Sequence, residues 1–71
     1  MHVQFVDLTT TIHVKRGIFD SDTTLRSVLN FFTAEWTCEK ITVNGSAVNE
    51  AALEQPIEDL GESDLQIEQH K

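Results

Sequence analysis

Histidine and cysteine are the side chains best suited to catalysis or metal binding, and neither type is arranged for it here. His2, His13 and His70 have no short spacing such as His-x₃-His, which would place two imidazoles on one metal. Cys38 is the only cysteine, so neither an intrachain disulfide nor a Cys₂ or Cys₄ metal site can form. No histidine lies near Cys38 in the sequence to activate its thiol. We therefore predict surface histidines, a small buried thiol, and no metal or other cofactor.

Two pairs of acids also have a spacing that chemistry could use. Asp20 and Asp22 lie in DSDTTLRSVLN, which lacks the central glycine and the final bidentate glutamate of a calcium loop. They fit better as capping residues at the positive end of a following helix. Glu58 and Asp59 are adjacent in a predicted loop without a partner acid. These residues predict a protein that is not an enzyme.

The net charge is concentrated in the last third of the chain. The 71 residues carry twelve acids against five bases, a net charge of −7. Met1–Asn44 has five acids and four bases, which gives −1, whereas Gly45–Lys71 has seven acids against Lys71 alone, which gives −6. The seven acids are Glu50, Glu54, Glu58, Asp59, Glu62, Asp64 and Glu68. Such a chain is repelled by nucleic acid and by anionic membranes and is attracted to basic partners. Solubility alone is the competing explanation of the acidity.

Length and composition predict one domain, residues 1–71, with a thin core. The single cysteine fits a cytoplasmic, reducing compartment. The start MHVQFVDLTT lacks the basic residues and long apolar run of a signal peptide. No run approaches the ~18 apolar residues of a membrane helix.

A β-hairpin is predicted at the start of the chain from the runs HVQFVDL and TTTIHVKR, which alternate between apolar and polar residues. If Thr9 and Thr10 form the loop, Phe5 faces Val14 across the two strands. Residues Thr24 to about Trp36 then predict a helix of roughly three to four turns, because its apolar residues recur at spacings of three and four. The N-cap of this helix is expected at Asp22 or Thr23.

The second half of the chain predicts a second hairpin and a final strand. Ile41 and Val43 alternate with polar residues before Asn44-Gly45, a strong two-residue turn signal, and a short return strand should follow at Ser46–Val48. NEAALEQP allows one helical turn, and DLQIEQ predicts the last strand. The order β-β-α-β-β-β predicts an α+β domain with one helix packed across a mixed sheet.

Val6 and Leu8 define a second candidate surface. They cannot share a strand face with Val3 and Phe5, so they look outward if Val3 and Phe5 pack under the helix. Exposed apolar strand residues indicate an interface, either in a homodimer or with another partner. A β-bulge that reverses the pattern is the alternative.

The element order, SDTTLRSVL before the helix, and ITVNGSAV followed by an acidic loop and DLQIEQ together resemble the β-grasp fold of ubiquitin-like and sulfur-carrier proteins. That resemblance covers most of the chain and implies a protein-binding module. The carriers of this family need a flexible glycine pair as their last residues. Here Glu68-Gln69-His70-Lys71 follows the last strand, and no glycine follows Gly61, so we expect no carrier chemistry.

The leading hypothesis is a non-enzymatic acidic inhibitor that blocks the nucleic-acid-binding surface of a basic protein by mimicking the charge of DNA. Its acidic character resembles that of DNA mimics made by phages, and a nucleoid-associated, histone-like protein is one target class. The seven acids of the last third would make the contacts, with Ile57 or Leu60 as apolar anchors. The alternatives are a ubiquitin-like or sulfur-carrier-type module and a docking or scaffold domain that acts through Val6 and Leu8.

Overall fold

The computed structural model of the chain describes residues 1–9, 12–61 and 63–71. Within these ranges the order β-β-α-β-β-β is confirmed, with one short helix and two 3₁₀ turns added to it. The elements are β1 (His2–Asp7), β2 (His13–Ile18), α1 (Leu25–Phe32), η1 (Cys38–Lys40), β3 (Ile41–Val43), β4 (Ser46–Ala47), α2 (Glu50–Leu53), η2 (Ile57–Asp59) and β5 (Asp64–Gln69).

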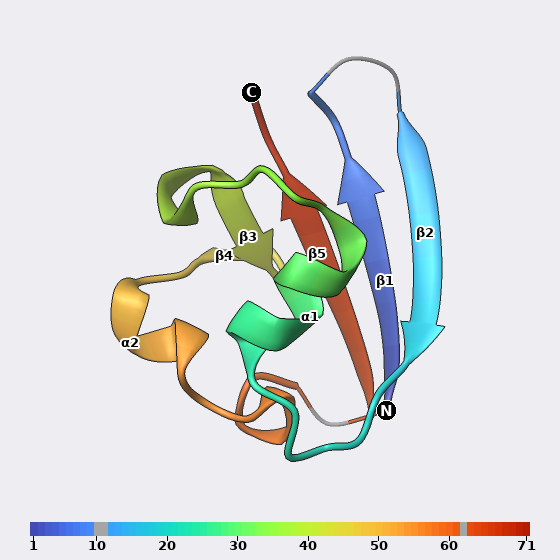
Figure 1. The fold of residues 1–71 in the computed structure, drawn as a ribbon, viewed down its shortest axis with the longest axis vertical. Helices are drawn as coiled ribbons and strands as arrows, with labels where there is room; N and C mark the ends of the chain where they lie inside the picture. Colours follow the sequence, from blue (N-terminus) through green and yellow to red (C-terminus); the bar gives the residue numbers. More distant parts are fainter. Residues whose placement is uncertain (10–11, 62) are drawn as a thin grey trace.

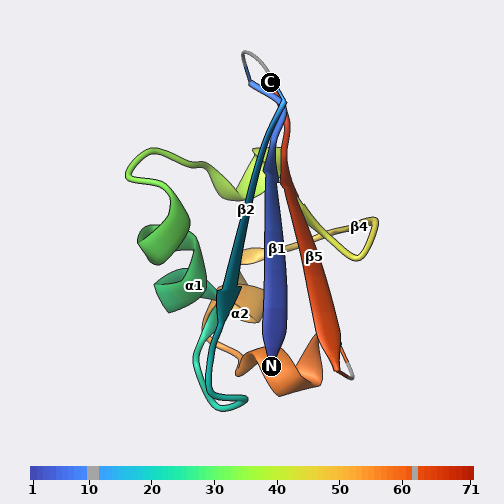
Figure 2. The same cartoon turned by 90° about the vertical axis from the view of Figure 1, so that its right-hand side faces the viewer.

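The five strands form one mixed sheet in the order β2-β1-β5-β3-β4. The central pair, β1 and β5, is parallel, and the other pairs are antiparallel. Figure 1 shows α1 lying across the sheet, and Figure 2 shows that α1 and α2 lie on the same side of it. The predicted α+β class is therefore confirmed. The sheet face opposite α1 is called the open face below.

The first hairpin has a longer connection than the sequence suggested. Val6 pairs with Val14 and Phe5 with Lys15, so the prediction that Phe5 faces Val14 was wrong by one residue. The backbone N–H and the hydroxyl of Thr9 both donate hydrogen bonds to Oδ1 of Asp7, at 2.9 and 2.6 Å. These bonds turn the chain directly after β1, and β2 begins only at His13. The predicted loop residue Thr10 lies outside the described residues.

Side chains along β1 alternate regularly between the two faces of the sheet. Its pairing with β2 is continuous from His2 to Asp7, which excludes the β-bulge. Val3 and Phe5 are buried under α1, and Val6 accordingly lies on the open face, as predicted.

Helix α1 starts later and ends earlier than predicted. Thr24 is its N-cap, with the N–H of Ser27 donating to the Thr24 hydroxyl oxygen at 3.3 Å, so the expectation of Asp22 or Thr23 was wrong. The backbone becomes extended at Thr33, whose hydroxyl oxygen accepts from the N–H of Glu35. This local hydrogen bond competes with helix continuation. Trp36 therefore lies beyond the helix and is half-buried there.

The Asn44-Gly45 turn is confirmed. Both residues have positive φ, 51° and 83°, as a tight hairpin turn requires. The Asn44 side chain also accepts a hydrogen bond from the N–H of Gln66 at 2.9 Å and donates one to the carbonyl oxygen of Leu60 at 3.3 Å. The turn is thereby fixed against the segment that leads into β5.

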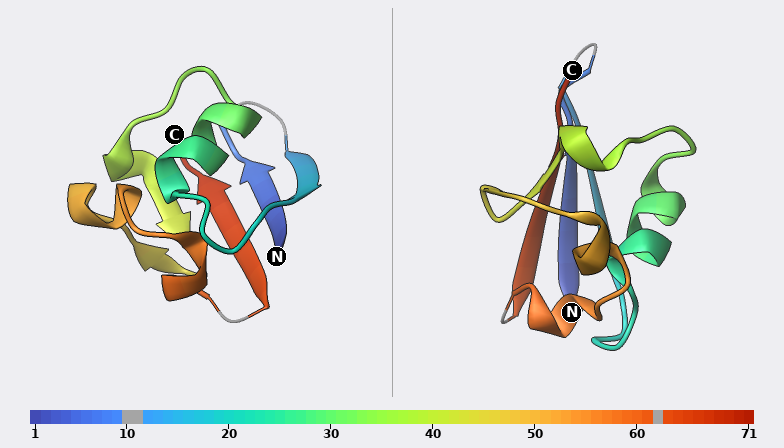
Figure 3. Two further views of the ribbon diagram at one scale, coloured as in Figure 1. Left: turned by 60° about the horizontal axis from the view of Figure 1, so that its bottom comes forward. Right: turned by 90° about the vertical axis from the view of Figure 1, so that its left-hand side faces the viewer.

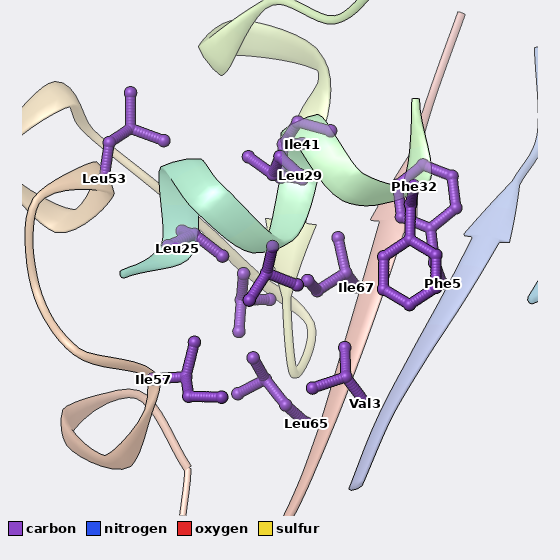
Figure 4. Packing of buried hydrophobic residues seen from close by; sticks show 12 residues of the cluster. Val3, Phe5, Leu25, Leu29, Phe32, Ile41, Leu53, Ile57, Leu65 and Ile67 are labelled. Atoms are coloured by element: carbon purple, nitrogen blue, oxygen red, sulfur yellow. The ribbon is translucent and has the colours of Figure 1, made fainter. Parts of the chain in front are cut away.

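The core lies between α1, α2, η2 and the covered face of the sheet (Figure 4). Phe5 stacks on Phe32 with ring centroids 5.3 Å apart. Gly17 leaves room for the rings above β2, since a Cβ there would lie 3.0 Å from Phe19 and 3.4 Å from Phe32. Ile57 is fully buried in this core, with 0% of its surface exposed. This corrects the prediction of Ile57 as an apolar anchor for a partner, because its side chain is already covered by its own domain.

Candidate protein-binding surface

Two loops far apart in the sequence are held together at one end of the molecule. The N–H of Ile57 donates to the carbonyl oxygen of Thr23 at 2.8 Å, and the N–H of Glu58 donates to that of Ser21 at 3.1 Å. These bonds join the connection between β2 and α1 to η2. The burial of Ile57 beneath them gives the junction an apolar support.

This junction places four exposed acidic residues on two loops whose backbones are in contact. Asp20 and Asp22 come from the first loop, and Glu58 and Asp59 come from η2. Asp64, also exposed, starts β5 at the same end of the sheet, because it pairs with His2 at the start of β1, which in turn pairs with Ile18 at the end of β2. Figure 3 shows the start of β5 at this end of the fold. We call Asp20, Asp22, Glu58, Asp59 and Asp64 the acidic end.

The sequence did not identify Asp20 and Asp22 as part of this surface. They had been assigned to capping α1, but Thr24 performs that role, which leaves their carboxylates exposed. The Asp-Ser-Asp spacing was visible in the sequence. Its proximity to Glu58 was not, because it depends on a contact between distant segments. One opposing group lies nearby: the Met1 ammonium donates to the carbonyl oxygen of Phe19 at 2.7 Å.

The seven acids predicted as contacts are not all in one place. Glu50 begins α2 and Glu54 is the residue that caps its C-terminus, where Glu54 accepts a hydrogen bond from Nε of Arg26 at 2.7 Å. Glu68 is half-buried on the open face, where Nε2 of His70 lies 3.8 Å from its carboxylate. Glu62 lies outside the described residues. Three of the seven, Glu58, Asp59 and Asp64, therefore belong to the acidic end.

The basic side chains of the described residues lie mainly elsewhere. Lys40 and Lys71 lie at the opposite end of the sheet, where the N–H of His70 donates to the carbonyl oxygen of Lys40 at 2.7 Å. Nζ of Lys15 donates to the carbonyl oxygen of Phe32 at 3.1 Å, at the negative end of α1. Arg16 lines an open-face hollow of about 450 Å³ together with Asp64, and Arg26 lies in the first turn of α1, shortly after the loop that carries Asp20 and Asp22.

Apolar surface lies apart from the acidic end. Val6 and Leu8 are half-buried, and Leu60 packs against the core from a half-buried position. The large apolar side chains that are most exposed surround β2 instead: Ile12, Val14, Ile18 and Phe31.

The residues capable of other chemistry are dispersed. Among the described residues no three histidine, cysteine or acidic side chains are grouped to hold a metal ion. Cys38 is half-buried, with its thiol donating to the carbonyl oxygen of Val48 at 3.3 Å. Nε2 of His70 lies 3.1 Å from the Thr42 hydroxyl oxygen. Within the described part of the chain, no helix has the length and hydropathy needed to cross a membrane.

Comparison with known proteins yields no relative: no family model, no curated protein and no solved structure matches the chain.

Proposed function

We propose that this protein is a non-enzymatic inhibitor that binds a basic, nucleic-acid-binding protein through its acidic end. The observation that carries the proposal is that the loop of Asp20 and Asp22 is joined to the loop of Glu58 and Asp59, by hydrogen bonds of 2.8 Å from Ile57 to Thr23 and 3.1 Å from Glu58 to Ser21.

The arrangement has the properties that charge mimicry requires. Its carboxylates are exposed, so they can approach a partner without first breaking buried contacts. The two loops that carry them are joined by the bonds from the N–H of Ile57 to Thr23 and from the N–H of Glu58 to Ser21, which lowers the ordering cost of binding. Clustered negative charge accelerates encounter with a basic cleft and makes the affinity sensitive to salt.

The target site that fits this surface is one that normally contacts phosphate groups. A groove lined with lysine and arginine that binds the DNA backbone is complementary to a cluster of fixed carboxylates. Nucleoid-associated, histone-like proteins are one class with such a groove, and a phage-encoded, cytoplasmic inhibitor of such a protein is the specific form of the proposal. Apolar contacts from Leu60, beside η2, would complement the charges.

Affinity capture from a bacterial lysate at low and at high salt tests the proposal. The immobilised chain should retain a basic, nucleic-acid-binding protein at low salt and release it at high salt. Mass spectrometry would identify that protein. Retention of no basic protein, or retention that salt does not change, would contradict the proposal.

The alternative function is a ubiquitin-like or sulfur-carrier-type module, or a docking or scaffold domain. The packing of α1 across a mixed sheet favours it, since the β-grasp resemblance implies a helix across a mixed sheet. The two functions respond differently to charge. Reversal of Glu58 and Asp59 to lysine should abolish mimicry, whereas docking through Val6 and Leu8 on the other surface should persist.

A further inference from the structure

We propose that two copies of this chain associate by antiparallel pairing of their β2 strands. Strand β2 is one edge of the sheet, and its far side has no neighbouring strand among the described residues. It is six residues long, whereas the opposite edge strand, β4, has only two. A long open edge presents a row of N–H and C=O groups that can add another strand.

Apolar side chains flank this edge on both faces of the sheet. Val14 and Ile18 lie on the open face, with 44% and 73% of their surfaces exposed. On the covered face, Phe31 is 69% exposed and packs edge-to-face on Phe19, with ring centroids 5.2 Å apart. Ile12, directly before β2, is 74% exposed. The four exposed residues, called the β2 rim, are the large apolar side chains that the described fold leaves most open to water.

A second copy of the chain offers partners for the backbone groups of β2 and for the apolar side chains on both faces of the sheet. In a dimer with two-fold symmetry, the same surface of each copy forms the contact. The β2 rim of one copy therefore meets the β2 rim of the other. Main-chain hydrogen bonds would join the two sheets into one, and the flanking side chains would bury apolar area above and below the new pair.

The charge distribution selects the antiparallel direction. Strand β2 ends beside the acidic end, with Asp20 two residues beyond Ile18, and it carries Lys15 and Arg16 in its middle. Antiparallel pairing places the acidic ends of the two copies at opposite extremes of the joined strands, where they are far apart. Parallel pairing would instead place the two acidic ends side by side, where they repel.

The basic residues of β2 do not block this edge. Charged side chains often protect edge strands from pairing. Lys15, however, is directed over the sheet, because its Nζ donates to the carbonyl oxygen of Phe32 at 3.1 Å. Arg16 lies on the open face with Val14 and Ile18 on either side of it, so the backbone edge stays accessible.

Sedimentation velocity of the full chain from low micromolar to submillimolar concentration tests the proposal. Ile18→Asp puts a charge into the rim, and Ala47→Asp is the matched control. Both positions are exposed, both lie on the same sheet face, and Ala47 belongs to the opposite edge strand. We expect a concentration-dependent dimer for the unsubstituted chain and for Ala47→Asp. Ile18→Asp should raise the dissociation constant at least about tenfold, since a charge introduced into an apolar contact must be desolvated.

A chain that stays monomeric at every concentration, or a dimer that Ile18→Asp leaves unchanged, would overturn the proposal. If circular dichroism shows that Ile18→Asp does not fold, amide hydrogen exchange of the unsubstituted chain tests whether β2 pairs with a second copy. The outward amides of His13–Ile18 should exchange more slowly at high concentration than at low concentration. Equal exchange at both concentrations, or protection only after an unrelated extended peptide is added, would contradict self-pairing. None of these results depends on the inhibitor function.

Discussion

The backbone N–H of Glu58 donates a hydrogen bond to the carbonyl oxygen of Ser21, 3.1 Å away. This contact connects a loop of the first half of the chain to a loop of the acidic last third. Each loop alone carries two carboxylates, an unremarkable number for a surface loop. Their junction produces the acidic end, on which the functional proposal rests.

Ile57→Ala should lower the free energy of unfolding by about 2–5 kcal/mol, because it leaves a cavity in the core. The side chain is fully buried, with 0% exposed. Since so small a domain is only marginally stable, partial unfolding at room temperature is expected. Urea denaturation measures the change. Glu58→Ala, at the adjacent exposed position, is the control and should change stability by less than about 0.5 kcal/mol. Equal effects of the two substitutions would show that Ile57 is not a core residue.

Gly45→Ala should destabilise the second hairpin by about 1 kcal/mol. Gly45 has φ of 83°, which an alanine adopts only with strain. An added Cβ there meets no described atom within 4 Å, so the cost comes from the backbone and not from crowding. Thermal unfolding measures it, with Ala47→Ser in the neighbouring strand as the control. A Gly45→Ala chain as stable as the original would be inconsistent with this turn.

Arg26→Ala should cost less than about 1 kcal/mol, although its Nε lies only 2.7 Å from Oε1 of Glu54. Both side chains are largely exposed, 49% and 64%, so water and salt screen their attraction. A double-mutant cycle with Glu54→Ala isolates the pair, and its coupling energy should shrink as salt is raised. A coupling that salt leaves unchanged would require a buried contact that the structure does not have.

Asp7 should make the stability depend on pH below neutrality. The hydroxyl and N–H of Thr9 hold the pKa of the Asp7 carboxyl below its ordinary value, and nearby His13 and Lys15 act in the same direction. A lowered pKa in the folded state stabilises the fold above the ordinary pKa, and this contribution is lost as pH falls through the lowered value. Asp7→Asn should therefore be less stable than the original chain at about pH 7, with the difference shrinking towards about pH 2. Urea denaturation at both pH values checks this. A difference that grows on acidification would contradict the assignment.

Local signals account for the parts of the fold that were predicted correctly. Asn44-Gly45 specifies its turn through backbone conformation alone, and the alternation of Val3 and Phe5 specifies which face of β1 is buried. The apolar residues of α1, at spacings of three and four, predicted a helix for the same reason, because helical periodicity depends on neighbouring residues.

The errors arose where local signals were ambiguous or absent. Asp22, Thr23 and Thr24 are three consecutive residues able to cap a helix, and only the final packing selects Thr24. The register of the first hairpin depends on the turn that Asp7 makes with Thr9, and it differs from the predicted register by one residue. Ile57 is an isolated apolar residue among acids, without a periodic pattern to show that it is buried. The acidic end depends on a contact between distant segments, which composition and spacing do not reveal.

The central claim is that the acidic end competes with nucleic acid for a basic protein. The most direct test is displacement of fluorescent duplex DNA from a panel of purified basic, DNA-binding proteins that includes histone-like ones. One variant carries Asp20→Asn, Asp22→Asn, Glu58→Gln and Asp59→Asn. Its control carries Glu35→Gln, Glu39→Gln, Glu50→Gln and Glu54→Gln. Each variant loses four of the twelve acids and so changes the net charge from −7 to −3.

We predict that the unsubstituted chain displaces DNA from at least one member of the panel. The control should retain most of that activity, because its changes lie on other elements. The acidic-end variant should lose about tenfold or more in apparent affinity, consistent with the loss of several charge contacts. Failure of the unsubstituted chain to displace DNA from any member, or an equal loss in the two variants, would contradict the account.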